Sequence, residues 1–189
     1  MAVPRCGPFS KGGSGVKARY VPRGFTLIEA VVVVGIIGIL VLVSLPGILG
    51  QAEVRGLENT GREIQSTLQK AKLQAVSTKF NHRVFFYLND ADRWEYTIER
   101  QETAGTWSPM PTSVVREIPG QYAVTVNLPA AGTGNAIEYS PVGMVINFAT
   151  VSNTVLVQSP SLKAKKQPDE IVLTVFMGGS IQFLKRVSV

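Results

Sequence analysis

The chain has 189 residues with a formal net charge of +6, and 45% of its residues are hydrophobic, enough for one domain of ordinary size. Residues 1–24 contain five basic residues and no acid, so the other residues carry a balance of only +1. A nucleic-acid-binding domain needs a basic face on its folded part, so this charge distribution argues against that class. Cys6 is the single cysteine and lies in the same segment, so residues 25–189 cannot form an internal disulfide.

Residues 1–24 are rich in Gly, Pro, Ser and basic residues and predict an unstructured cytoplasmic leader that is removed. Residues 25–50 are apolar, and 21 of them precede Pro46. A helix of that length spans a bilayer at about 1.5 Å per residue. Because basic side chains lie on its amino side, we expect the N-terminus in the cytoplasm and the remainder across the membrane.

The alternative for this segment is an ordinary secretory signal, since Gly50 and Ala52 have a spacing that a signal peptidase could use. The apolar core of a signal is about 7–15 residues long, whereas this run is longer and contains Glu29. An acid inside a membrane segment costs about a few kcal/mol near the bilayer centre and less near its edge. We therefore interpret residues 25–50 as a membrane helix.

Residues 51–80 continue the helical pattern with one narrow apolar stripe. The stripe consists of Val54, Leu57, Gly61, Ile64, Leu68, Ala71 and Ala75. This pattern predicts one long helix, of which the first half is apolar all round and the second half lies on a domain. Pro46 marks a predicted kink.

Residues 81–189 predict a β-rich globular domain, because short runs rich in Val, Ile, Phe and Tyr alternate with turn residues. The predicted strands are 83–88, 93–100, 122–128, 136–139, 145–149, 154–158, 170–176 and 180–187. Residues 177–180 predict a tight hairpin. The predicted fold class is therefore α+β, with a long N-terminal helix packed on an antiparallel β-sheet domain.

Residues 23–29 (RGFTLIE) carry the chemistry. Glu29 lies four residues after Phe25, about 6 Å along a helix axis. Cleavage between Gly24 and Phe25 would create a positively charged α-amine. The Glu29 carboxylate would neutralise that amine in the same chain or on a neighbouring subunit, and would thereby set the axial register between packed helices.

Gly24, Phe25, Glu29, the basic leader, the apolar run and Pro46 together resemble the amino-terminal signature of type IV pilins and type II secretion pseudopilins. The resemblance implies that a prepilin peptidase cuts after Gly24, that Phe25 is N-methylated, and that Glu29 pairs with a Phe25 amine during assembly. It implies a type IV pilin-like fold in a single-pass protein of the bacterial inner membrane with a periplasmic domain. The implied partners are other pilin-like subunits, an inner-membrane assembly platform and membrane lipid, but no nucleic acid.

Residues 137–143 (IEYSPVG), 170–176 and 179–183 resemble the globular domain of type II secretion protein H and of FimT/FimU-like minor pilins. Major pseudopilins usually carry a calcium loop near the C-terminus, and no such acidic cluster is visible here. We therefore expect a minor pseudopilin of a type II secretion system without enzymatic activity, cofactor or metal. The alternatives are a minor type IV pilin that primes a pilus, and a membrane-anchored periplasmic enzyme or binding domain.

Three further features receive structural interpretations. His82, the single histidine, is expected to begin a strand at the surface, since no nucleophile motif accompanies it. Residues 89–92 (NDAD) predict a hairpin turn rather than a calcium loop. The basic run 163–166 predicts a solvated loop rather than a contact with DNA or lipid, because Asp169 and Glu170 follow it.

Overall fold

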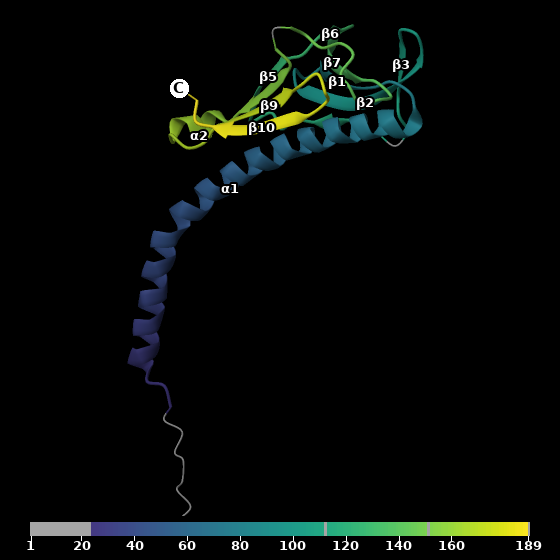
Figure 1. Cartoon of the computed structure of the whole chain (residues 1–189). Coiled ribbons are helices and arrows are strands. Elements are labelled where there is room, and N and C mark those ends of the chain that lie inside the picture. Colours follow the sequence, from purple (N-terminus) through teal and green to yellow (C-terminus); the bar gives the residue numbers. More distant parts are fainter. Residues whose placement is uncertain (1–23, 112, 151, 189) are drawn as a thin grey trace, which may run out of the picture. The chain divides into compact units, whose positions relative to one another are not determined.

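The computed structural model describes residues 24–111, 113–150 and 152–188, with the backbone alone for 42–50 (Figure 1). The predicted leader lies outside these ranges except for Gly24, and so does the side chain of Pro46. The chain divides into two compact units, Met1–Val43 and Ser44–Val189. Each unit is described below by itself.

Helix α1 (Leu27–Thr78) runs through 52 residues and belongs to both units. In the first unit, the described side chains from Leu27 to Val41 are exposed. In the second unit, the predicted stripe is confirmed, because Leu57, Ile64 and Leu68 are buried. No helix within the described ranges has an apolar stretch long enough to cross a membrane. The membrane span at 25–50 stays a prediction.

The second unit contains two antiparallel sheets. The first sheet has the order β3-β2-β1-β7-β6, with β4 also paired to β2, and the second has the order β10-β9-β8-β5. The strands of the first sheet are β1 (His82–Leu88), β2 (Trp94–Thr103), β3 (Thr106–Pro109), β4 (Arg116–Glu117), β6 (Ala130–Ala131) and β7 (Gly134–Tyr139). Those of the second are β5 (Ala123–Asn127), β8 (Thr154–Gln158), β9 (Glu170–Val175) and β10 (Ile181–Arg186). A short helix, α2 (Pro160–Ala164), connects β8 to β9.

The core lies between the sheets and the buried stripe of α1 (Figure 1). In the first sheet, Val84 pairs in register with Ile98 on one side and Ile137 on the other, and all three side chains are buried. Phe86 stacks on Tyr96 with their ring centroids 5.4 Å apart. This arrangement confirms the predicted α+β class, in which a long helix packs on an antiparallel β domain.

The predicted strand at 145–149 is wrong. Val145 forms only an isolated bridge with Tyr139, and its amide donates to the carbonyl of Met177 at 2.9 Å. Asn147 places its side chain where a strand would place its backbone: Nδ2 donates to Ala136 O at 2.9 Å, and Oδ1 accepts from Glu138 N at 3.0 Å. The apolar composition predicted a strand, but the Asn147 side chain, rather than a strand backbone, forms the hydrogen bonds with the backbone of β7.

Both predicted turns are confirmed. The amide of Phe176 donates to the carbonyl of Ser180 at 2.9 Å, and Gly179 between them has φ +70°. That left-handed conformation favours glycine. At the other turn, the Asn89 side-chain oxygen accepts from the amides of Ala91 and Arg93, each at 3.0 Å.

The expected surface position of His82 is wrong. His82 does begin β1, but its ring is buried, and Nδ1 lies 3.0 Å from the carbonyl oxygen of Phe80. Burial lowers the pKa of His82, because the charged imidazolium is poorly solvated there. The period of β1 explains the burial, since His82, Val84 and Phe86 lie on one face of the strand.

Candidate processing and assembly site

The predicted cleavage site lies where the chain passes from non-helical backbone into α1. Residues 24–26 are not helical, and α1 begins at Leu27. Phe25 is 77% exposed, and among the described residues other than its chain neighbours none has an atom within 4 Å of the position that a Cβ on Gly24 would take. Exposed, irregular backbone is the preferred substrate of proteolysis. The bond between Gly24 and Phe25 therefore has the accessibility that a peptidase requires.

Thr26 caps the helix. Its Oγ1 accepts a hydrogen bond from the Glu29 amide at 3.3 Å, and its carbonyl accepts from the Ala30 amide at 3.2 Å. A threonine followed three residues later by glutamate is the capping-box spacing. Our sequence interpretation missed this role of Thr26, although the Thr-x-x-Glu spacing was a signal that could have revealed it.

Glu29 lies in the first turn of α1, and its side chain is exposed. A carboxylate is favoured there because the N-terminal end of a helix carries a partial positive charge. Glu29 forms no ion pair with any residue in the described part of the chain. A new amine at Phe25 would add positive charge at the same helix end, and Glu29 would offset it from one turn away. This pairing remains a prediction, because the structure is that of the uncut chain.

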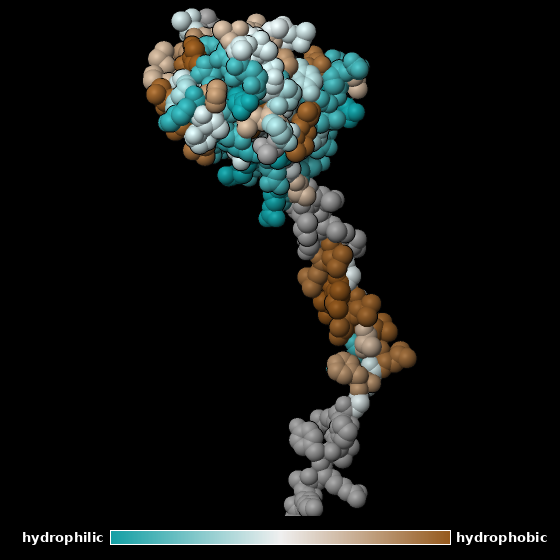
Figure 2. Space-filling model, turned by 90° about the vertical axis from the view of Figure 1, so that its right-hand side faces the viewer, coloured by the Kyte–Doolittle hydropathy of each residue, from teal (hydrophilic) through white to brown (hydrophobic). Residues whose placement is uncertain are grey.

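The helix that follows presents an apolar surface on every side. Its larger side chains are between 44% and 83% exposed, and the apolar surface of this segment is brown in Figure 2. They are Leu27, Ile28, Val31, Val32, Val33, Val34, Ile36, Ile37, Ile39, Leu40 and Val41. Soluble monomers rarely expose a continuous apolar patch larger than a few hundred Å². A surface of this kind requires lipid or another apolar protein segment as its environment.

The second half of α1 is joined to the sheets by polar contacts as well as by its buried stripe. Lys72 Nζ donates to the carbonyls of Gly178 and Gly179, each at 3.1 Å. Glu53 pairs with Lys165 at 2.7 Å, and Glu63 pairs with Arg116. This half of the helix therefore finds its partners within its own chain.

Clusters of metal ligands and cavities are the places where a catalytic site would be sought in the described β domain. No group of three His, Cys, Asp or Glu side chains with metal-binding proximity occurs among the residues that the structure describes. A cavity of about 360 Å³ beside β2 and β5 is lined mainly by Trp94, Ile118 and Tyr122. Of its two charged lining residues, Asp92 and Arg93, the arginine already pairs with Glu117 at 2.6 Å. The cavity has no convergent set of polar groups of the kind that marks an active site.

Comparisons with known proteins support the interpretation of the N-terminal segment. Residues 22–45 match the family model described as the prokaryotic N-terminal methylation motif. This match confirms the resemblance to type IV pilins and pseudopilins on the segment that contains Gly24, Phe25 and Glu29. No curated protein matches the chain.

One solved structure resembles the fold, that of the minor pseudopilin EpsH from the Type 2 Secretion System of Vibrio cholerae. It is 10% identical in sequence, with a TM-score of 0.48. The match covers 68% of this chain and 95% of that chain.

Proposed function

We propose that the chain is a minor pseudopilin of a type II secretion system, a structural subunit of the periplasmic pseudopilus that helps to export folded proteins. The supporting observation is the exposed, non-helical Gly24–Phe25 junction placed directly before a helix with an apolar surface on every side. In this proposal the subunit acts mechanically and catalyses nothing itself. The peptidase that cuts it and the platform that assembles it are separate proteins.

In this proposal the subunit passes from the membrane into the filament. Residues 25–50 first anchor it in the bacterial inner membrane, with the β domain in the periplasm and lipid around the apolar helix. A prepilin peptidase then cuts after Gly24, and Phe25 becomes N-methylated. During assembly, the helices of other pilin-like subunits replace lipid around the same apolar surface, and tight packing and polar contacts supply the association energy.

Glu29 gives this assembly its register. Residues 25–50 contain no other charged side chain, so Glu29 is the single group in the helix surface that needs a charged partner. An unpaired carboxylate in an apolar bundle is penalised, whereas a carboxylate beside a Phe25 amine is compensated. Helices that slide out of register lose this compensation, which favours one axial offset over its neighbours.

The processing step is tested by mass spectrometry of the protein purified from cells with and without the prepilin peptidase. We expect a chain that begins at N-methylated Phe25 in the first case and an uncut chain in the second. The Gly24→Val variant should also remain uncut. Since the space around Gly24 is open, a loss of cleavage would reflect recognition by the peptidase rather than misfolding. An uncut wild-type chain in peptidase-positive cells would overturn the proposal.

The assembly step is tested with Glu29→Gln, which removes the charge and keeps the shape. This variant should insert into the membrane and be cleaved, yet enter the filament poorly, as measured by cross-linking within isolated filaments. The identity of the cross-linked partners also distinguishes a role in a type II secretion pseudopilus from a role in a type IV pilus. Pseudopilins of a type II secretion system support our proposal, whereas pilus subunits would indicate a minor type IV pilin. Normal incorporation of Glu29→Gln would refute the charge-pair account.

A further inference from the structure

The basic run at residues 163–166 is exposed to solvent, as its sequence predicts, but the acids that follow it do not lie against it. Lys163, Lys165 and Lys166 are all exposed, at the end of α2 and just beyond it. Ser159 caps α2, with its Oγ accepting from the Leu162 amide at 3.4 Å, and the Leu162 side chain is buried. The lysines are therefore presented by an anchored turn.

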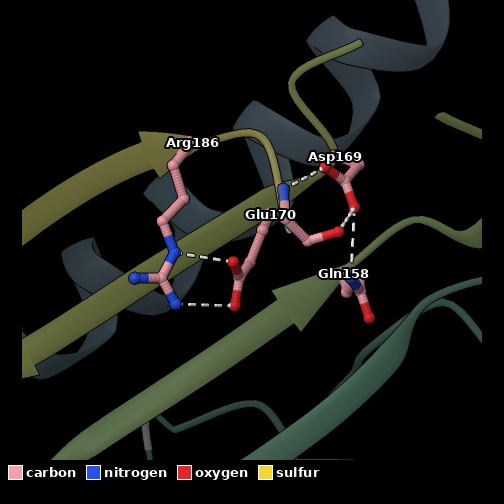
Figure 3. A network of polar contacts seen from close by, with 5 residues as sticks. Gln158, Asp169, Glu170 and Arg186 are labelled. Atoms are coloured by element: carbon pink, nitrogen blue, oxygen red, sulfur yellow. Dashed lines mark hydrogen bonds and ion pairs between the residues drawn. The ribbon is translucent and has the colours of Figure 1, made fainter. Parts of the chain in front are cut away.

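The two acids that follow the lysines do not neutralise them, because both carboxylates are engaged elsewhere (Figure 3). Asp169 is buried and accepts hydrogen bonds from the Ser188 amide at 2.8 Å, the Ser188 hydroxyl at 2.7 Å and Gln158 Nε2 at 3.1 Å. Glu170 accepts two bonds from Arg186, at 2.6 Å and 3.1 Å. The positive charge of the loop is thus left uncompensated by its sequence neighbours.

One lysine links the loop to α1. Lys165 Nζ pairs with Glu53 Oε2 at 2.7 Å, which places this part of the loop beside Glu53. Lys163 and Lys166 have no ion pair within the residues that the structure describes. The pair between Lys165 and Glu53 therefore serves as a latch, and the other two ammonium groups are available to an external anion.

The latch lies close to the end of the apolar run. Glu53 is eight residues after Leu45, so at most about 12 Å of helix axis separates them. The polar layer of a bilayer extends about 5–8 Å beyond the hydrocarbon on each side. A charge also acts over a Debye length of about 8–10 Å at ordinary ionic strength. With residues 25–45 across a bilayer, Glu53 and the Lys165 ammonium paired with it lie within the electrostatic reach of the lipid headgroups. Lys163 and Lys166 are the sequence neighbours of Lys165 on the same turn.

The rest of the domain has the opposite charge balance. Residues 81–139, which contain every strand of the first sheet, carry four basic and seven acidic side chains. Residues 140–188 carry five basic and two acidic ones, and those two acids are Asp169 and Glu170. An anionic surface would attract the second part of the domain and repel the first. The charge distribution thus favours one orientation of the domain on such a surface.

We propose that Lys163 and Lys166, positioned by the Lys165–Glu53 latch, form a contact site for the headgroups of anionic phospholipid. The site holds the β domain against the membrane surface while the subunit awaits assembly. Clusters of basic residues next to a membrane segment bind anionic lipid through this electrostatic attraction. This inference rests on the proposed function, because it needs the apolar helix to be in a bilayer.

The test uses the full-length chain reconstituted in vesicles of phosphatidylcholine, or of phosphatidylcholine in which about a third of the lipid is replaced by phosphatidylglycerol. The rate of lysine acylation is measured at each lysine by mass spectrometry. We expect Lys163 and Lys166 to react several-fold more slowly in the anionic vesicles, and high salt to remove the difference. Lys70 is an internal control, because it is exposed and lies about 25 Å further along α1 than Glu53.

Two double variants with the same change in charge make the test specific. Lys163→Gln with Lys166→Gln should abolish the preference for phosphatidylglycerol, measured as the enrichment of that lipid around the reconstituted protein. Lys70→Gln with Lys79→Gln should leave it intact. Equal acylation rates in the two vesicles, or equal slowing at Lys70, would overturn the lipid site alone. A chain that floats with neither vesicle would instead remove the membrane anchoring on which the proposed function depends.

Discussion

The two halves of helix α1 have the same backbone conformation but differ in how their apolar side chains are arranged and covered. From Leu27 to Val41 the apolar side chains face outward in every direction. From Leu57 to Ala75 the apolar side chains form one stripe, which the sheets of the same chain cover. A helix that packs on its own domain needs only one apolar side, whereas a helix surrounded by lipid or by other helices needs apolar residues all round. The periodicity of the sequence thus indicates whether the partner of a helix lies inside or outside the chain.

The largest expected effect on stability comes from creating a cavity between the second half of α1 and the sheets. Leu68 is fully buried, so Leu68→Ala should lower the free energy of unfolding by about 2–5 kcal/mol. The matched variant in the first half is Ile36→Ala, at a side chain that is 53% exposed, and it should leave domain stability unchanged. Urea unfolding in detergent, followed by the fluorescence of Trp94 and Trp107, measures both. Equal destabilisation by the two variants would contradict the division of the helix.

The glycines of the two halves provide a second comparison. A Cβ on Gly61 would lie 2.8 Å from Ile171 Cγ2 and 3.0 Å from Phe183 Cε2, so the helix approaches β9 and β10 closely at this residue. Gly61→Val should cost about 3 kcal/mol through overpacking. Apart from the adjoining helix backbone and chain neighbours, no atom of the described residues lies within 4 Å of the Cβ position of Gly35, and Gly35→Val should unfold like the wild type. The same urea experiment decides, and an undisturbed Gly61→Val would mean that α1 can move away from the sheet at little cost.

A smaller expected effect is the pH dependence of domain stability that Asp169 confers. Burial acts to raise the pKa of Asp169, but hydrogen bonds from Ser188 and Gln158 outweigh it and hold the pKa below its usual value. The folded state therefore binds this proton more weakly than the unfolded chain does. Its contribution is complete above an unfolded pKa of about 3.9 and is lost as the pH falls below that value. Thermal unfolding as a function of pH should show this acid limb.

The variant Asp169→Asn isolates that contribution. It replaces an acceptor of three hydrogen bonds by a group with one amide oxygen, and should destabilise the domain by about 2 kcal/mol at neutral pH. It should also flatten the acid limb of the stability profile. Gln182→Asn, at an exposed position of β10, is the control and should preserve that limb. An unchanged acid limb in Asp169→Asn would assign the pH dependence to other carboxylates.

The features predicted from the sequence were those with a regular spacing. The 3.6-residue period located the buried stripe of α1, and the fixed offsets of Gly24, Phe25 and Glu29 located the motif. The errors arose where a tertiary contact decided the outcome. Asn147 replaced a strand by side-chain hydrogen bonds, and His82 was buried by the alternation of β1.

The basic loop shows a related limit of sequence analysis. The sequence predicted a solvated loop because Asp169 and Glu170 follow the lysines, and the lysines are exposed. The partners of the two acids were not predicted: they come from β8, β10 and the segment after β10. Proximity along the chain was a poor guide to charge pairing, because tertiary folding brings Arg186 and Ser188, distant in sequence, beside these two acids.

The smallest expected effect distinguishes the charged residues of the two halves of α1. Lys72→Met keeps most of the packing of the side chain but removes the ammonium that donates to Gly178 and Gly179. It should cost about 1 kcal/mol and increase hydrogen exchange at residues 177–180. The control Lys70→Met changes an exposed lysine two residues away and should do neither. Unchanged exchange in Lys72→Met would show that the hairpin does not depend on this contact. The expected result would mean that a charge in the second half already has its partner within the chain, whereas in our proposal Glu29 in the first half acquires one only during assembly.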